Sequence, residues 1–233
     1  MPSCLTESQI VELSDRICAS LISQAAHALA TSSLDEIGEI TLRDSLILAV
    51  SAFSSSIRLA VIQDREYTPD GWEDSAIDLA ILRKNTQQRE EFIGGVELKW
   101  WRRSDTQNAA NRRRDIVKDL IRTATLYSQV TDFAFMALLT TDVSWEKTIG
   151  KKSPDRKVMD KLTASAVEKW KIEEIQHTPC VSSAINYLKP KVSIPNIFHT
   201  KLLSSLELKF ASGRSASAKI WLVKKPQKSY WLS

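Results

Sequence analysis

Apolar positions recur along this chain with two different periods, and the change of period divides it into elements. From Thr6 to Ala30 the apolar residues fall three or four positions apart, as on one face of a helix: Ile10, Leu13, Ile17, Leu21 and Ala25. The stretch from Thr41 to Phe53 repeats this spacing and predicts a second helix. The first helix is expected either to cover a sheet or to contact a second copy of the chain.

Short apolar runs predict three strands after these helices. They cover Arg58–Tyr67, Ser75–Arg83 and Glu91–Trp101, with a turn signal at Pro69-Asp70-Gly71 and a polar connection over 85–90. The third run is apolar almost throughout, which is typical of a strand buried on both faces. We therefore expect the third strand to be covered on both faces of the sheet.

A helix is predicted next, over residues 107–128, and a buried strand over 132–141. A strand, a helix and a strand at this spacing form a parallel crossover. A loop over 144–154, a helix over 155–170 and a hairpin of strands 202–210 and 217–224 follow. The chain is thus expected to be one α/β domain over residues 1–233, with its core at 41–142, an N-terminal helix at 6–30 and a C-terminal extension, the β-hairpin included, at 171–233.

Candidate chemistry lies on the second and third strands. Asp78 follows Ile77, and nineteen residues later Glu97 begins the tripeptide Glu97-Leu98-Lys99. Side chains two apart on a strand share a face, so Glu97 and Lys99 are expected to project together. Mg²⁺ prefers oxygen ligands and takes one or two protein carboxylates, which Asp78 and Glu97 would supply with the backbone carbonyl of Leu98. Lys99, with a pKa lowered by burial, would hold or deprotonate an attacking water.

The tripeptide alone is a weak signal, because Glu207-Leu208-Lys209 repeats it. That second copy has no Asp shortly before it, since the last Asp is Asp160, and we expect it on the exposed face of a late strand. The first copy is preceded by Gly94-Gly95, which allows close backbone approach. The alternative, a solvated Glu/Lys pair on a structural strand, stays open.

The segments Ile77-Asp78 and Val96-Glu97-Leu98-Lys99 resemble the PD-(D/E)XK nuclease superfamily, with Ile77 where the usual Pro stands. The resemblance covers about residues 41–142 and implies a restriction-endonuclease-like fold, a mixed sheet flanked by helices. It implies a Mg²⁺- or Mn²⁺-dependent endonuclease that hydrolyses DNA, and a homodimer where both strands are cut. Restriction and anti-phage defence are the expected settings, and junction resolution and repair stay open because enzymes of all these kinds share this core. The family often adds one more acid, for which Glu66 is the first candidate and Glu39 or Asp44 the others.

The net charge of +4 is unevenly distributed. Basic residues gather from Lys99 to Lys118, and five of them are candidates for phosphate contact: Arg102, Arg103, Arg112, Arg113 and Arg114. The alternative is a solvated helix face on which Lys118 pairs with Asp115 and Arg122 with Asp119. Trp101 is expected either to pack in the core or to stack on a base near the site.

Other patterns narrow the function. No apolar run is long enough to span a bilayer, and the start of the chain has no signal-peptide pattern. Three widely spaced cysteines and three isolated histidines form no metal-ligand motif, which favours reduced thiols in a cytoplasmic protein. No glycine-rich phosphate loop is present, which argues against an ATP-driven enzyme. The alternatives to a nuclease are an inactive nucleic-acid-binding module on the same fold and an assembly protein.

Overall fold

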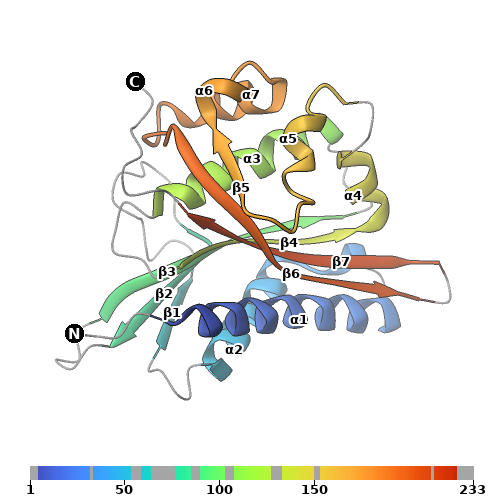
Figure 1. The fold of residues 1–233 in the computed structure, drawn as a ribbon. Coiled ribbons are helices and arrows are strands. Elements are labelled where there is room, and N and C mark those ends of the chain that lie inside the picture. The colour runs from blue at the N-terminus through green and yellow to red at the C-terminus, as the bar shows by residue number, and fades with distance from the viewer. Residues whose placement is uncertain are drawn as a thin grey trace.

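A twisted mixed sheet of seven strands lies at the centre of the computed structural model, with helices on both of its faces (Figure 1). The structure describes residues 5–31, 34–53, 59–63, 77–84, 90–102, 108–126, 133–149, 153–210 and 213–224. The strands lie in the order β1-β2-β3-β4-β7-β6-β5. The class is therefore α/β.

The elements have the following bounds. The strands are β1 (Leu59–Gln63), β2 (Leu79–Lys84), β3 (Glu90–Trp101), β4 (Phe133–Thr141), β5 (Glu168–Lys171), β6 (Ile197–Lys209) and β7 (Ser215–Lys224). The helices are α1 (Glu7–Thr31), the 3-10 turn η1 (Leu34–Glu36), α2 (Glu39–Phe53), α3 (Ala109–Thr125), α4 (Asp142–Ile149), α5 (Arg156–Asp160), α6 (Ile172–Ile175) and α7 (Pro179–Leu188).

The unit β3-α3-β4 forms the middle of the sheet and confirms the predicted crossover. β3 and β4 pair in parallel, with Val96 opposite Phe135. The remaining strand pairs are antiparallel, including β2 with β3, in which Leu79 lies opposite Val96. The apolar run predicted to be a doubly buried strand is thus the one between β2 and β4.

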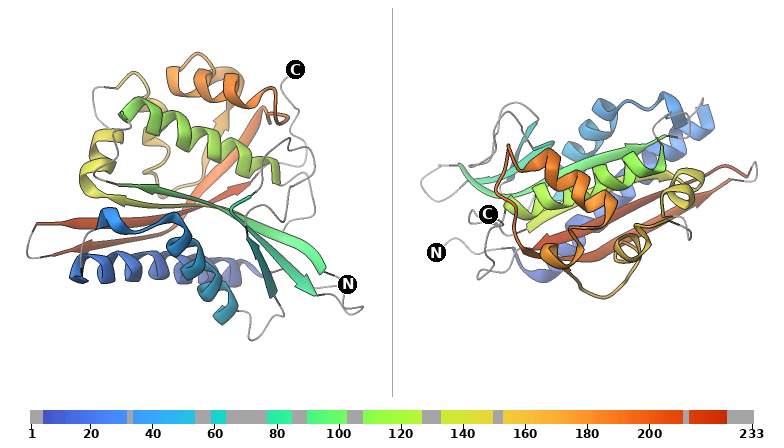
Figure 2. Two further views of the ribbon diagram at one scale, coloured as in Figure 1. Left: turned by 180° about the vertical axis from the view of Figure 1, so that it is seen from behind. Right: turned by 90° about the horizontal axis from the view of Figure 1, so that it is seen from above.

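The two faces of the sheet carry separate cores. Helices α1 and α2 cover one face, and α3, α4 and α7 lie over the other (Figure 2). Val96, Leu98 and Trp100 of β3 pack with α1 and α2. Because side chains alternate along a strand, Glu97, Lys99 and Trp101 are on the α3 side. This alternation decides on which face the candidate site is built.

The N-terminal helix covers the sheet, as one of the two alternatives predicted. Its residues Leu13, Ile17 and Leu21 are fully buried in the core beneath β4, β6 and β7. The hydroxyl groups of Ser14 and Ser204 lie 2.7 Å apart at this contact. The helix is therefore part of the domain core.

Three predictions for the second half of the chain are corrected. The expected loop over 144–154 contains most of α4, and the expected helix over 155–170 is only α5, followed by the edge strand β5. The hairpin of β6 and β7 is confirmed, but it is no extension, because β7 pairs with β4 along Phe135–Thr141. The free edge of β4 needs a partner for its backbone groups, and the C-terminal hairpin supplies it.

Two further observations concern the described residues alone. No helix among them is long and apolar enough to cross a membrane. Cys18 and Cys180 are free thiols in the interior, as expected, while Cys4 lies outside the described residues.

Candidate functional site

Asp78 lies directly before β2 and bonds to β3 through its side chain. Its Oδ2 accepts a hydrogen bond from the backbone N–H of Leu98 at 2.8 Å. The antiparallel pairing of β2 with β3 ends at Leu79 and Val96. The Asp78 carboxylate therefore takes the place of the next β2 backbone carbonyl as a hydrogen-bond acceptor for β3. Asp78 is thus held beside the Glu97-Leu98-Lys99 tripeptide, as the spacing in the sequence predicted.

Two glycines allow this approach. A Cβ on Gly95 would overlap Cδ1 of Ile77, the residue before Asp78. A Cβ on Gly94 would lie 2.5 Å from the ring of Phe133 on β4. The close backbone approach predicted for this pair is confirmed, because a side chain at either position would push β3 away from its neighbours.

The three charged residues predicted on β3 and directly before β2 each lie beside an opposite charge from a helix. Arg43 of α2 places Nη2 3.2 Å from Oδ1 of Asp78. Arg122 of α3 places Nη2 3.2 Å from Oε1 of Glu97. The Nζ of Lys99 lies 3.1 Å from Oδ2 of Asp119, also on α3. Both covering layers therefore contribute to the site.

The alternative of a helix face on which Arg122 pairs with Asp119 and Lys118 with Asp115 is confirmed for both pairs, but Asp119 is buried and also contacts Lys99, which the sequence did not predict. Asp119 is only 2% exposed, and its carboxylate is shared by three cations: Lys99, Lys118 at 3.5 Å and Arg122 at 3.8 Å. A signal was present, because Asp119 is three residues after Ile116 and adjacent to Leu120, both on the buried stripe of α3. An acidic residue on the apolar stripe of a helix must be buried, and a lysine on the strand that this helix covers is a candidate partner for it.

The site is open to solvent at two of its groups. The side chains of Asp78 and Lys99 are 22% and 26% exposed, whereas those of Glu97 and Asp119 are 5% and 3% exposed. A ligand would therefore meet Asp78 and Lys99 first, with the two buried carboxylates behind them.

Burial raises the pKa of both predicted acids. The pKa of Glu97 is well above its usual value because the carboxylate is desolvated, and the charge of Arg122 only partly offsets this. Desolvation also raises the pKa of Asp78, against the Leu98 N–H and Arg43. These carboxylates are costly to bury as anions, so a cation that binds them relieves that cost.

Lys99 has the opposite pKa shift from the one expected. Its pKa is raised, first by the charge of Asp119, which outweighs the effect of burial. The expectation of a lowered pKa is thus wrong, because it left out the acid on α3. Lys99 is an ammonium that can donate hydrogen bonds to a water or a phosphate oxygen, and it is a poor general base.

The donor set fits a hard divalent cation held by few protein ligands. Among the described residues, no three Asp, Glu, His or Cys side chains are close enough to hold a metal ion. Mg²⁺ needs only one or two carboxylates, however, and Asp78, Glu97 and the Leu98 carbonyl offer oxygen. Oε1 of Glu97 is buried and accepts no hydrogen bond from a described residue, although Arg122 is near. A cation there would compete with Arg43 and Arg122.

The predicted phosphate-binding arginines differ in how they lie. Arg112 and Arg113 are buried: Arg112 donates to the carbonyl of Arg102 at 3.1 Å, and Arg113 pairs with Asp155 at 2.7 Å. Arg114 pairs with the neighbouring Asp115, and its side chain is 34% exposed. Arg102 is half-buried, and Arg103 lies outside the described residues. Among the described members, only Arg102 and Arg114 keep surface that a phosphate could reach.

The other residues that the sequence suggested for the site lie in the core, on the surface or outside the described residues. Trp101 is 1% exposed and stacks on Trp145 at 6.2 Å, so it packs in the core. Glu39 and Asp44 are exposed on α2, while Glu66 lies outside the described residues. Glu207 and Lys209 are 58% and 73% exposed and 3.7 Å apart, which confirms the surface position predicted for the second tripeptide.

Comparison with known proteins adds no assignment. The chain matches no protein-family model, no curated protein and no solved structure.

Proposed function

We propose that this protein is a metal-dependent nuclease that hydrolyses phosphodiester bonds in DNA at Asp78, Glu97 and Lys99. One observation carries the proposal: the Asp78 carboxylate bonds to the Leu98 N–H and so lies beside the Glu97/Lys99 pair. The order of helix, antiparallel strands, crossover helix and parallel strand supports the resemblance to the PD-(D/E)XK superfamily and its restriction-endonuclease-like fold.

In the proposed site, Asp78, Glu97 and the Leu98 carbonyl would hold Mg²⁺ or Mn²⁺. Such an ion, when bound, neutralises phosphate charge and lowers the pKa of a water ligand. Lys99, kept as an ammonium by Asp119, would donate hydrogen bonds to a non-bridging phosphate oxygen and stabilise the negative charge that develops there. The burial of Glu97 and Asp119 strengthens these interactions because water is excluded behind them.

The cellular setting proposed is restriction or anti-phage defence. Cutting both strands of a duplex requires two active sites, so we also propose a homodimer for that reaction. An inactive nucleic-acid-binding or assembly protein on the same fold is the second candidate. One observation favours it: Arg43 and Arg122 already neutralise the two carboxylates proposed to hold the metal.

A plasmid assay with matched variants tests the proposal. Supercoiled DNA is incubated with Mg²⁺ or Mn²⁺, or with EDTA, and with wild type, Asp78→Ala, Lys99→Ala and Lys209→Ala. We expect metal-dependent nicking or linearisation by wild type and by Lys209→Ala, and none by the other two. Lys209 is the control because it belongs to the same tripeptide at an exposed position.

The other outcomes assign the alternatives. Cleavage by Lys99→Ala at the wild-type rate would refute the site. Binding of DNA without any cleavage would favour the inactive nucleic-acid-binding module, and neither binding nor cleavage would favour the assembly protein.

A further inference from the structure

A half-exposed tyrosine lies beside the candidate site with two ammonium groups around it. Tyr187 of α7 is 49% exposed, and α7 packs against α3. Lys191, just after α7, donates a hydrogen bond to Oη of Tyr187 at 3.1 Å, and its Nζ is 4.2 Å from the ring centroid. The Nζ of Lys118 on α3 is 5.2 Å from the same centroid. We call Lys118, Tyr187 and Lys191 the Tyr187 surface.

The Tyr187 surface is connected to the candidate site through one carboxylate. Asp119 contacts Lys118 at 3.5 Å with Oδ1 and Lys99 at 3.1 Å with Oδ2. The charge of Arg122, which contacts Glu97, also acts on Tyr187. A ligand on this surface would therefore lie next to one bound at Lys99.

Positive charge is in excess around these groups. Among the described residues Lys191 has no carboxylate partner, and Lys118 shares its two with Lys99, Arg114 and Arg122. Such an excess beside exposed side chains attracts an anion.

The phenol adds a directional donor to the two ammonium groups. Since Oη of Tyr187 accepts the hydrogen bond from Lys191, its own O–H hydrogen is left to donate elsewhere. That hydrogen bond, followed by the charge of Lys191, also lowers the pKa of Tyr187, which makes the hydroxyl a stronger donor. Two ammonium groups and a hydroxyl are the donors that commonly contact phosphate oxygens of nucleic acids.

We propose that the Tyr187 surface binds the sugar–phosphate backbone of the nucleic acid, one or more phosphates away from the phosphodiester at Lys99. The assignment to nucleic acid rests on the proposed function. We choose a polymer over a small anion because it carries several phosphates, one for Lys99 and another for the Tyr187 surface that Asp119 and Lys118 connect to Lys99. The sequence did not indicate this surface, since Tyr187 and Lys191 lie in the proline-interrupted stretch after the predicted core.

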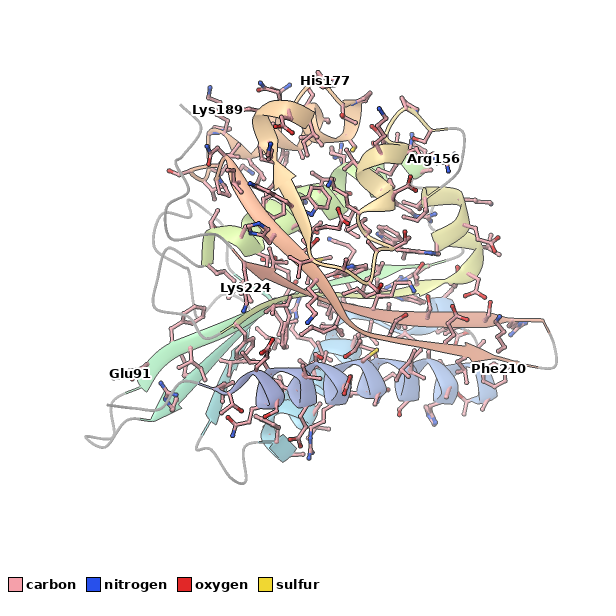
Figure 3. All side chains as sticks on the ribbon, in the orientation of Figure 1. Glu91, Arg156, His177, Lys189, Phe210 and Lys224 are labelled. Carbon is pink, nitrogen blue, oxygen red and sulfur yellow. The ribbon has the colours of Figure 1, made fainter. Side chains whose placement is uncertain are left out.

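The surface is tested by binding rather than by cleavage. Affinity for a fluorescent DNA duplex is measured by anisotropy in EDTA, over a series of salt concentrations, for wild type, Lys191→Gln, Tyr187→Phe and Lys157→Gln. Lys157 is an exposed lysine on α5. Figure 3 shows its neighbour Arg156 at the opposite end of the helical layer from Lys189, which stands two residues before Lys191.

We expect Lys191→Gln to weaken binding about 5-fold and to reduce the slope of log Kd against log salt by about one, as for a lost phosphate contact. Tyr187→Phe should weaken binding about 3-fold without changing the slope, because it removes a neutral donor. Lys157→Gln should match wild type. Tyr187 is exposed and Lys191 is half-buried with no carboxylate partner among the described residues, so the fold should be kept.

The outcomes separate this inference from the proposed reaction. If Lys191→Gln lowers the slope while wild type cuts no DNA, the surface stands and the nuclease proposal fails. If Lys191→Gln behaves like Lys157→Gln, the inference is overturned even if wild type is an active nuclease. The inference is also overturned if wild type binds no DNA. It is overturned as well if inorganic phosphate, at constant ionic strength, displaces DNA from wild type but not from Lys191→Gln, because Lys191 would then belong to a small-anion site.

Discussion

The ammonium of Lys99 lies 3.1 Å from Oδ2 of Asp119, so that a strand residue and a helix residue twenty positions apart form one charged unit between β3 and α3. Asp119 is the main cause of the raised pKa of Lys99. The carboxylate also contacts Lys118 and Arg122, which ties the other cations of α3 to the same point. In the proposed enzyme, Asp119 positions Lys99 and keeps it charged.

Replacing Asp119 with Asn should therefore impair cleavage more than binding. We expect a loss of about 10²-fold in the cleavage rate, the size expected for a misplaced reacting group. DNA affinity should be kept or increased, since a negative charge is removed. Plasmid cleavage rates and anisotropy measure the two effects. Asp160→Asn, at an exposed acid on α5, is the matched control.

A pH profile distinguishes positioning of Lys99 from a general structural effect. Because the pKa of Lys99 is raised, the wild-type lysine stays charged up to and beyond its ordinary titration range near pH 10.5. Asp119→Asn removes the largest cause of the raised pKa and leaves burial opposed only by Glu97 and Asp78, so cleavage by the variant should fall at a lower pH than cleavage by wild type. The same alkaline limit in both proteins would contradict the role given to Asp119.

The local pattern was enough to predict the strands and the crossover around the site. Alternation placed Glu97 and Lys99 on one face, and the helical stripe of Ile116 and Leu120 predicted α3, although the face that α3 covers comes from the structure alone. The ion pairs were not predictable in the same way. The partner of Asp78 is Arg43, which comes from the other covering layer, and no local period relates them.

Tertiary packing explains the elements that were predicted wrongly. Trp145 lies between Trp101 and Trp221, at 6.2 and 6.3 Å, and this contact favours α4 where the sequence suggested a loop. Trp170 stacks on Phe198 and donates its N–H to Thr200 at 2.9 Å, which places it in the edge strand β5. In both places, partners distant in the sequence decide between conformations that local propensity leaves close in energy.

Glu97→Gln should stabilise the protein at neutral pH while it abolishes cleavage. The pKa of Glu97 in the folded protein is raised above the unfolded value of 4.5. The protonated carboxyl therefore supports folding fully below pH 4.5, and this stability is lost as pH rises through the folded pKa and the buried group ionises. The amide carries no charge at any pH. We expect a gain of about 1 kcal/mol at pH 8, within the range seen when a strained functional group is removed.

Thermal unfolding at a series of pH values measures this difference. The advantage of Glu97→Gln over wild type should grow as pH rises above 4.5 and become constant above the folded pKa. Glu207→Gln, at the exposed copy of the tripeptide, should leave stability within a few tenths of a kcal/mol. A variant less stable than wild type at pH 8 would show that the pair with Arg122 outweighs the burial of Glu97.

Arg113 should matter for stability rather than for DNA binding. Its guanidinium pairs with Asp155 at 2.7 Å and donates to the carbonyl of Thr148 at 3.1 Å, while Asp155 also accepts the N–H of Cys180 at 2.9 Å. Arg113→Ala leaves Asp155 as a buried charge, with an expected cost of about 3–5 kcal/mol. Urea unfolding measures it.

Arg114→Ala is the matched control at the adjacent position. Its pair with Asp115 is partly exposed, so a loss of at most about 1 kcal/mol is expected. In DNA binding the order should be reversed: Arg114→Ala should weaken binding, and Arg113→Ala should leave it unchanged. Equal stability of the two variants would contradict the structural role of Arg113.

Gly94→Ala tests the close packing that sets β3 beside its neighbours. The new Cβ would lie 2.5 Å from the ring of Phe133, which is fully buried and packs on Phe135 at a centroid distance of 4.7 Å. We expect a loss of about 1–3 kcal/mol from overpacking. Gly38→Ala, whose Cβ would meet nothing nearer than 3.8 Å, should cost at most about 1 kcal/mol, the effect of a less favourable residue before the first turn of α2. Because β3 also carries Glu97 and Lys99, the cleavage rate of Gly94→Ala should fall even below its unfolding temperature. An unchanged stability and rate would mean that β3 can shift without moving the site.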